Sequence, residues 1–311
     1  MELKWLEDFV TLADCSSFSR AAEMRNITQP AFSRRIKQLE AWLGATLITR
    51  ATMPAELTPA GQHFLPIAQE AISTFYTARE TLRPASQATL LRFAALHTLV
   101  MTFFPDWLQR LKAEGIALRS SHIPDRGGIE ANLAALIDGD ADFLLTYAHS
   151  RVPFHLDHGH FDHVTVGLDR LVPVVAPEVH LPGRGLLAGH GILDRAIDEG
   201  IALPYLSYGY SSFFGVALGR LFAECPPFRR QIAHENTISA GLKTLALTGA
   251  GLCWLPESLI GEELAAGSLV LASQSDHWTL ALEIRLYRHR AAKSRPIEAL
   301  WLAVNRMGQG H

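Results

Sequence analysis

The distribution of glycine and histidine divides this chain into two unequal parts. Of its 23 glycines only Gly44 and Gly61 occur before residue 84, and of its 14 histidines only His63 does. Because glycine marks turns and loops, residues 1–83 are predicted to be mostly helical and the remainder richer in turns. The small, polar run 83–89 contains a proline that stops a preceding helix, so a linker is predicted there, with its hinge at 84–89.

Composition places the chain among ordinary globular proteins. Its 311 residues predict two or three domains, since a domain commonly takes roughly 100–200 residues. Hydrophobic residues make up 48% and charged residues 19%, which excludes a disordered or collagen-like chain. The net charge of -3 excludes a uniformly basic nucleic-acid coat but leaves room for a local basic patch.

Cysteine usage and the N-terminus indicate a compartment. Cys15, Cys225 and Cys253 are too few and too scattered for a disulfide framework. The first eight residues carry three acids and no apolar run, so no secretory signal is predicted. Since nowhere do 18 apolar residues follow one another, we expect a cytoplasmic protein that does not span a membrane.

The segment 18–40 is typical of two short helices joined by a tight turn. Ser19 is predicted to cap the first helix and Thr28 the second, with Pro30 in a first turn where its missing N–H does no harm. Apolar residues then recur at spacings of four, three and four, which predicts one buried stripe: Phe32, Ile36, Leu39 and Leu43.

The second helix carries polar residues off this stripe: Gln29, Ser33, Arg34 and Lys37. A helix-turn-helix places such a face in the DNA major groove, where Gln29 can pair with adenine and Arg34 with guanine or a phosphate. Six basic residues against two acidic ones give residues 16–50 a local charge of +4: Arg20, Arg25, Arg34, Arg35, Lys37 and Arg50 against Glu23 and Glu40. This count alone also fits a solvated helix, but together with the turn, cap and stripe it favours binding of double-stranded DNA.

A long helix is predicted from Thr58 to about residue 83, with Thr58 as its cap and Pro59 at its first position. Apolar residues within it follow the a/d spacing of a coiled coil: Phe64, Ala68, Ala71, Phe75, Ala78 and Leu82. The alternative is a single amphipathic helix docked on its own domain.

Taken together, these N-terminal motifs resemble those of the LysR-type transcriptional regulators. They stand in the family's order and spacing: Leu6-x2-Phe9, Ser17-Phe18-x2-Ala21-Ala22, Thr28-Gln29-Pro30-Ala31-x-Ser33, Leu39-Glu40, Leu43-Gly44, Arg50 and Leu57-Thr58-x-Ala60-Gly61. The resemblance implies a winged helix-turn-helix domain over 1–57 whose DNA-binding residues are Thr28, Gln29, Pro30, Ser33, Arg34, Lys37 and Arg50, the last on the wing 45–57. It also implies a dimerisation helix over 58–83 that uses Phe64, Ala71, Phe75, Ala78 and Leu82, a homodimer assembling to a homotetramer, and leaves contact with RNA polymerase open.

Beyond residue 89, short apolar runs alternate with amphipathic stretches, which predicts an α/β fold with a parallel, doubly wound sheet. Predicted strands are 90–96, 116–123, 143–147, 171–176, 203–208, 231–234, 251–255 and 282–288, and predicted helices are 105–113, 129–136, 213–224, 239–248 and 296–306. The architecture resembles type 2 periplasmic binding proteins. That resemblance implies an effector-binding domain over 90–306, with lobe I at 90–163 and 268–306 and lobe II at 164–267.

Polar residues that follow predicted strands are candidates for an effector site between the lobes: His97, Thr98, Tyr208, Tyr210, Ser211 and Thr237. Ligands of open α/β sheets lie beyond the carboxyl ends of strands, at helix N-termini whose N–H groups favour anions. We therefore expect a small anionic effector, although each serine or threonine fits equally well as a helix cap.

Three alternatives accompany this prediction. The runs 205–210 and 249–257 resemble the hypochlorite-responsive branch of the family, which implies oxidation of methionine, yet none of the five methionines lies in 164–267. The cluster His149, His155, His158, His160 and His163 could hold a metal, but a solvated loop is the favoured interpretation. Sensing through Cys225 and Cys253 would need both thiols close together.

No catalytic motif of the common enzyme classes occurs, so neither catalytic residues nor a cofactor nor a metal is predicted. An intracellular solute-binding protein or enzyme is the distant alternative.

Overall fold

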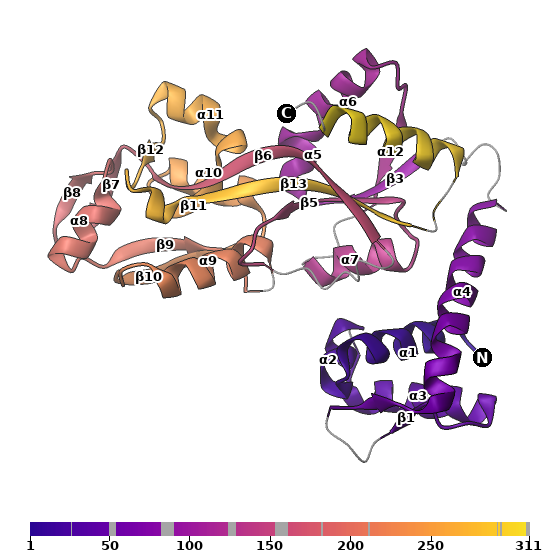
Figure 1. Ribbon diagram of the computed structural model, residues 1–311. Helices are drawn as coiled ribbons and strands as arrows, with labels where there is room; N and C mark the ends of the chain where they lie inside the picture. Colours follow the sequence, from indigo (N-terminus) through magenta and orange to yellow (C-terminus); the bar gives the residue numbers. More distant parts are fainter. Residues whose placement is uncertain are drawn as a thin grey trace. The chain divides into compact units, whose positions relative to one another are not determined.

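The structure is a computed structural model that describes residues 1–25, 27–49, 54–81, 90–123, 129–152, 161–181, 183–210, 212–290, 292 and 294–308 (Figure 1). The chain forms two compact units. The first consists of Met1–Thr89 with His289–Ile297, and the second of Leu90–Arg288 with Glu298–His311.

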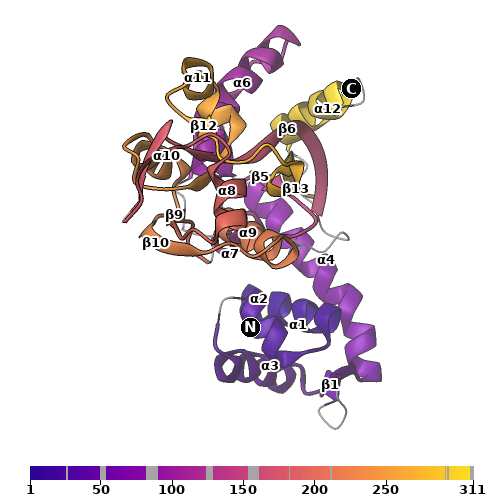
Figure 2. The ribbon, with the colours of Figure 1, turned by 90° about the vertical axis from the view of Figure 1, so that its left-hand side faces the viewer.

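The first unit is a helical bundle with a two-stranded wing (Figures 1 and 2). Its elements are α1 (Leu3–Cys15), α2 (Phe18–Met24), α3 (Gln29–Leu43), β1 (Ile48–Thr49), β2 (Glu56–Leu57) and α4 (Pro59–Thr81). The antiparallel wing pairs Ile48 with Leu57 and Thr49 with Glu56. Arg50, which was predicted to lie on this wing, falls outside the described residues.

The predicted helix pair is present, but one of its caps was assigned to the wrong residue. Ser17, not Ser19, caps α2, and its hydroxyl accepts a hydrogen bond from the Arg20 N–H at 3.4 Å. Ser19 lies inside the helix. Thr28 occupies the N-cap position of α3 without a side-chain capping bond. At the other end Gly44 stops α3 in a left-handed conformation that favours glycine.

The buried stripe of α3 forms the centre of this unit. Phe32, Ile36 and Leu39 are fully buried, as predicted, and Leu43 packs at the edge of the same cluster. A close approach by α4 completes the core, because a Cβ added at Gly61 would lie 2.2 Å from the carbonyl oxygen of Leu47. Only glycine fits there.

Helix α4 begins as predicted. The Thr58 hydroxyl accepts the Gly61 N–H at 3.0 Å and donates to the carbonyl oxygen of Thr46 at 2.6 Å. Its first half packs against its own domain, where the Phe64 ring lies 5.5 Å from that of Phe9 and Ala68 is fully buried.

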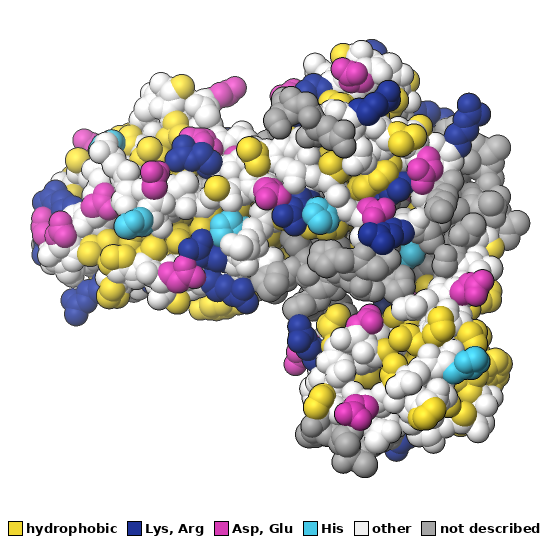
Figure 3. Space-filling view, viewed as in Figure 1, with side chains coloured by type: hydrophobic (Ala, Val, Ile, Leu, Met, Phe, Trp, Pro, Cys, Tyr) yellow, Lys and Arg dark blue, Asp and Glu magenta, His cyan; other side chains and the backbone are white. Residues whose placement is uncertain are grey.

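The outward face of α4 carries two exposed large apolar side chains among polar ones. Phe75 is 56% exposed and Ile67 is 48% exposed, whereas Leu82 lies outside the described residues. Figure 3 shows hydrophobic side chains on the visible face of this unit. The Phe64 end of α4 is therefore docked on its own domain, as the alternative interpretation predicted. The Phe75 end exposes an apolar side chain to solvent.

The second unit is a mixed α/β fold with these strands: β3 (Leu90–Ala95), β4 (Arg119–His122), β5 (Phe143–Ala148), β6 (Phe161–Val175), β7 (Glu178–Leu181), β8 (Gly185–Ala188), β9 (Leu203–Ser207), β10 (Arg230–Glu235), β11 (Cys253–Pro256), β12 (Val270–Leu271) and β13 (Leu280–His289). Its helices are α5 (His97–Thr102), α6 (Phe104–Ala113), α7 (Ile129–Ile137), α8 (Ile192–Glu199), α9 (Phe213–Glu224), α10 (Ser239–Leu247), α11 (Glu257–Ala266) and α12 (Arg295–Gly308), with a short 3-10 turn η1 (Asp276–Trp278). The predicted alternation of strands and helices is confirmed, while α5, α8, α11 and the β7–β8 hairpin were not foreseen.

The sheet is not purely parallel, contrary to the prediction. The main sheet has the order β11-β6-β13-β5-β3-β4, and β12 also pairs with β6. Pairs β3–β4, β3–β5 and β9–β10 are parallel, whereas β6–β11, β6–β12 and β5–β13 are antiparallel. The reason is that β6 and β13 are long strands that run between the two lobes, as Figure 1 shows.

The lobes meet along these two strands. β6 has 15 residues, of which the prediction found only the end, and this end pairs with β11 and β12. Trp278 packs on Trp254 and on Phe228, and β12 pairs with β6, so residues 270–278 lie with the strands of lobe II although they follow the expected lobe boundary at 267. Among the described residues, no helix has the length and apolarity to cross a bilayer.

Candidate DNA-binding surface and effector site

The polar face of α3 is presented outward. The buried stripe fixes the rotation of this helix, so that the opposite side chains reach solvent: Thr28, Gln29, Pro30, Arg34 and Lys37 are exposed, and Ser33 is half-buried. The exposed Ser19 hydroxyl donates to Gln29 Oε1 at 3.3 Å, which links α2 to the first turn of α3. This arrangement presents amide, hydroxyl and cationic groups on one face of one helix, the chemistry that reads base edges and phosphates in a major groove.

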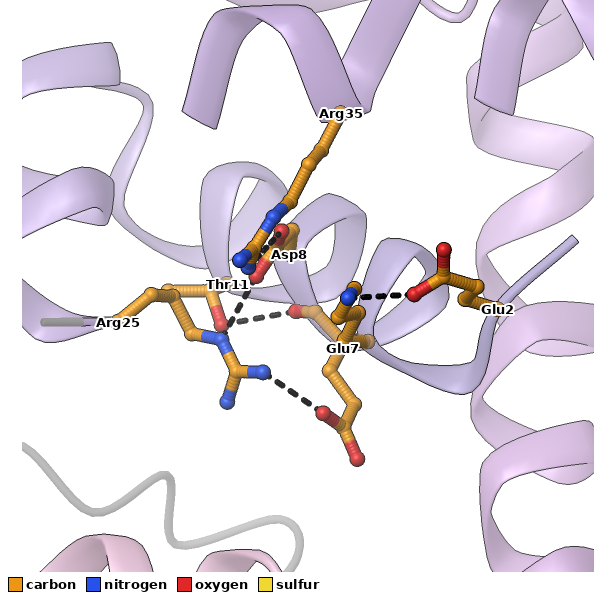
Figure 4. A network of polar contacts seen from close by, with 7 residues as sticks. Glu2, Glu7, Asp8, Thr11, Arg25 and Arg35 are labelled. Atoms are coloured by element: carbon orange, nitrogen blue, oxygen red, sulfur yellow. Dashed lines mark hydrogen bonds and ion pairs between the residues drawn. The ribbon is translucent and has the colours of Figure 1, made fainter. Parts of the chain in front are cut away.

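Two of the six basic residues counted in the sequence do not belong to this surface. Arg25 and Arg35 form ion pairs with acids of α1, which lie before residue 16 and so escaped the count (Figure 4). The expected local charge of +4 therefore overstates what is available for phosphates. Arg34 and Lys37 are the exposed cations of α3.

In the second unit, three hydroxyl groups from different elements meet between the lobes. Thr98 lies on α5 of lobe I, Tyr208 follows β9 of lobe II, and Ser239 begins α10 of lobe II. Thr98 Oγ1 donates to Ser239 Oγ at 3.1 Å, and Tyr208 Oη donates to the same oxygen at 2.9 Å. All three side chains are buried. Two of the predicted effector residues are thus brought together by a serine that the prediction omitted.

The other predicted effector residues lie apart from this group. His97, Tyr210 and Thr237 are exposed, and Ser211 lies outside the described residues. The Thr237 methyl group packs near Gly209, where an added Cβ would lie 3.1 Å from it. Ser212 caps α9 by accepting the Gly215 N–H at 3.0 Å, which is the helix-cap role that the sequence left open for these serines.

A second polar network links the lobes at the other end of α5. Ser258 of α11 donates its hydroxyl proton to Asp169 Oδ2 at 2.6 Å, and the same Ser258 Oγ lies 3.2 Å from Thr102 Oγ1. Tyr147, buried at the end of β5, donates to the same carboxylate oxygen at 2.9 Å. The sequence analysis missed this network, because Asp169 lies just before the predicted strand 171–176 and its partners lie far away in the sequence.

Aromatic rings join the two networks. The Phe214 ring lies 5.2 Å from that of Tyr147 and 5.1 Å from that of Tyr208. Tyr208 therefore contacts α5 through Ser239. At its other end, α5 contacts Ser258, which bonds with Tyr147 to Asp169. The Phe214 ring links Tyr147 to Tyr208. These contacts join α5 to lobe II and combine hydroxyl groups, the Asp169 carboxylate and aromatic rings.

The described residues give little support to a metal site at the histidines or to sensing by the cysteines. His149 Nδ1 accepts the Arg151 N–H at 3.0 Å, and burial lowers the pKa of His149. His163 packs on the Tyr287 ring, while His155, His158 and His160 lie outside the described residues. Within the described ranges, no three His, Cys, Asp or Glu residues are grouped to hold a metal ion.

The three cysteines are free thiols. Cys253 is buried, and burial raises the pKa of its thiol, which makes it a poor nucleophile. Cys225 Sγ donates to the carbonyl oxygen of His277 at 3.3 Å.

A helix-turn-helix unit with an outward polar recognition face, followed by a two-lobed α/β unit with a polar site between its lobes, defines the class of ligand-responsive DNA-binding transcriptional regulators. Comparison with known families agrees. Residues 3–62 match the model of the bacterial regulatory helix-turn-helix protein of the LysR family, and residues 84–308 match the LysR substrate binding domain. The chain belongs to the LysR family of transcriptional regulators.

Similar proteins cover nearly the whole chain. The HTH-type transcriptional regulator YjiE of Escherichia coli (strain K12) is 27% identical over 97% of this chain and 93% of its own. Full-length HypT from Salmonella typhimurium, described as a hypochlorite-specific LysR-type regulator, is 26% identical over 100% of both chains with a TM-score of 0.56. Vibrio fischeri DarR, solved in complex with DNA, is 28% identical over 98% of both chains with a TM-score of 0.54.

The buried tyrosines give a prediction about alkaline stability. Burial raises the pKa of four of them above the ordinary value of 10.0: Tyr147, Tyr205, Tyr208 and Tyr287. Because the folded state holds these protons more tightly than the unfolded state, stability is fully present below pH 10 and falls as pH rises past it. Denaturant unfolding at a series of pH values measures the slope. Tyr208→Phe should show a shallower fall above pH 10, since unfolding then releases one proton fewer, and an unchanged slope would contradict the assignment.

Proposed function

We propose that this regulator binds specific double-stranded DNA through the exposed face of α3, in the cytoplasm, and that a small anionic molecule bound between the lobes of its effector domain controls it. The observation that carries the effector proposal is the meeting of Thr98, Tyr208 and Ser239 through hydrogen bonds between the lobes. A ligand that takes over these bonds changes what holds the lobes together.

Two features of this site favour a small anion. Its three side chains are neutral hydroxyls, which can donate to an anion without the energetic cost of a buried charge. Ser239 is also the first residue of α10, so it stands at a helix N-terminus, where the helix dipole favours a negative charge. The hydroxyls and the start of the helix together supply several donors to one ligand oxygen or carboxylate.

The ligand regulates only if it binds one arrangement of the lobes better than another. Hydrogen bonds between neutral groups contribute about 0.5–1.5 kcal/mol each, so a ligand that replaces two of them can shift such an equilibrium without first breaking strong contacts. Substitutions of Thr98, Tyr208 or Ser239 should therefore change the response to the effector and leave basal DNA affinity intact.

Thr98→Val tests the site, since it keeps the side-chain volume and removes the hydroxyl. In a thermal-shift screen against small organic and inorganic anions, a compound that stabilises the wild type should bind Thr98→Val roughly tenfold more weakly, the effect of one lost hydrogen bond. Thr244→Val is the matched control. Thr244 is an exposed residue of α10, and among the described residues its hydroxyl bonds only to the backbone of its own helix, at Ala240. If Thr98→Val and Tyr208→Phe both respond as the wild type does, the effector binds elsewhere.

Oxidation of sulfur is the second candidate for the signal, and one observation favours it. Met101 is 54% exposed and lies on α5 between Thr98 and Thr102, which make the two polar contacts to lobe II. Conversion of its thioether to a sulfoxide would add polarity at this position. A hypochlorite response that Met101→Leu abolishes, together with no anion response, would place this candidate first.

The DNA-binding surface is tested by Gln29→Ala and Arg34→Ala. Each should lose about 1–3 kcal/mol of binding to a duplex enriched by the wild type from a random pool, because each removes a group placed to contact a base edge or phosphate. Titration of a labelled duplex measures the loss. Lys4→Ala, an exposed cation of α1, is the charge control and should bind normally. Wild-type affinity in both α3 variants would show that another surface meets the DNA.

We further propose that α4 pairs two subunits through the face that carries Phe75, and that the dimers assemble to a homotetramer able to contact RNA polymerase. Phe75→Glu should dissociate the dimer in sedimentation, because it places a charge in an apolar seam. Phe64→Ala should leave the dimer intact and lower the unfolding temperature of the first unit, since Phe64 packs on its own domain. Intact dimers of Phe75→Glu would exclude this seam.

A further inference from the structure

A buried carboxylate joins helices α1, α2 and α3 of the DNA-binding unit. Asp8 of α1 is fully buried, although it carries a charge. Its Oδ1 accepts from Arg25 Nε at 2.8 Å, and its Oδ2 accepts from Arg35 Nη1 at 3.3 Å. Arg25 ends α2, and Arg35 lies in the middle of α3. Figure 4 shows both guanidinium groups directed at this one side chain.

A neighbouring acid completes the arrangement. Glu7 Oε2 accepts from Arg25 Nη2 at 2.7 Å, so this guanidinium is held between two consecutive acids of α1. Burial by itself would lower the pKa of Arg25, but Glu7 and Asp8 outweigh it and raise that pKa. The cation is therefore fixed by charge on both sides.

The direction of Arg35 is the informative detail. Arg34 and Arg35 are adjacent on α3 and thus lie about 100° apart around the helix. Arg34 is exposed on the recognition face, whereas Arg35 turns toward α1 and its side chain is 26% exposed. A flexible arginine on a DNA-binding helix would otherwise be free to contact any phosphate within reach.

We propose that Asp8 is a positioning residue for DNA recognition, which sets the orientation of α3 through Arg35 and the turn before α3 through Arg25. This inference rests on the proposed DNA-binding face of α3. Base contacts demand a fixed helix orientation, whereas phosphate contacts made by long side chains tolerate small shifts. Loss of the Asp8 charge should therefore reduce sequence discrimination more than it reduces attraction to DNA as such.

Asp8→Asn is the test variant, because it keeps the shape of the side chain and removes its charge. Two probes are needed, a duplex enriched by the wild type from a random pool and a scrambled duplex of the same composition. Glu23→Gln is the matched control, since it removes one negative charge from an exposed position on α2. Binding is compared at equal concentrations of folded protein, measured by near-ultraviolet circular dichroism.

Asp8→Asn should bind the enriched duplex roughly ten- to hundredfold more weakly than the wild type does, which is the range of one or two lost base contacts. It should bind the scrambled duplex as tightly as the wild type does. Glu23→Gln should keep the wild-type ratio between the two duplexes. Arg35→Met should lower the ratio in the same direction as Asp8→Asn does. The double variant should lose less than the sum of the two single losses, since both changes remove the contact between Asp8 and Arg35.

Two results would overturn the proposal. One is an unchanged ratio in Asp8→Asn, and the other is an equal loss on both duplexes, which indicates only damage to the fold. Failure of the proposed DNA-binding face itself would be recognised separately, because the wild type would then enrich no duplex or Gln29→Ala would bind it normally.

Discussion

The two lobes of the effector unit depend on two long strands that belong to both of them. β6 pairs with β11 and β12 through its last residues, and β13 pairs with β5 over Glu283–Tyr287 while lying beside β6 in the sheet order. Two strands that run through both lobes within one sheet leave the lobes few ways to move other than bending about those strands. Among the described residues, side-chain contacts made by Thr98 and Thr102 of α5 also join the lobes.

Helix α5 concentrates those contacts. Although it has only six residues, its Thr98 bonds to Ser239 and its Thr102 bonds to Ser258. One contact uses hydroxyls alone, and the other includes the carboxylate of Asp169, which receives hydrogen bonds from Tyr147 and Ser258. The charged network is the stronger of the two, because hydrogen bonds to ionised groups exceed those between neutral groups. An effector that acts at the hydroxyl contact can therefore alter the lobes while the carboxylate network keeps α5 in place.

The DNA-binding unit has the opposite requirement, since the proposed DNA-binding face of α3 needs a fixed orientation. A hydrophobic stripe fixes which face of α3 is buried, but apolar contacts alone tolerate small rotations and sliding. The buried Asp8 adds contacts that depend on distance and direction, to Arg25 and to Arg35. Such ion pairs contribute little net stability when their cost of desolvation is counted. Their value here lies in the geometry that they impose on α3.

Sequence patterns by themselves determined the local features of this protein. The stripe Phe32, Ile36 and Leu39, the Thr58 cap and the alternation of strands and helices all follow from periodicity and backbone chemistry within a few residues, and the N-terminal motifs indicated the family. What the sequence could not decide were contacts between distant residues. Thr98 and Ser239 are 141 positions apart, and Asp169 and Ser258 are 89 apart. The inward turn of Arg35 and the burial of Phe64 likewise depend on α1, whose acids and rings the local patterns did not connect with either residue. Hydrogen bonds and ion pairs act over a few ångströms, so only the tertiary structure, which brings these side chains together, could select their partners.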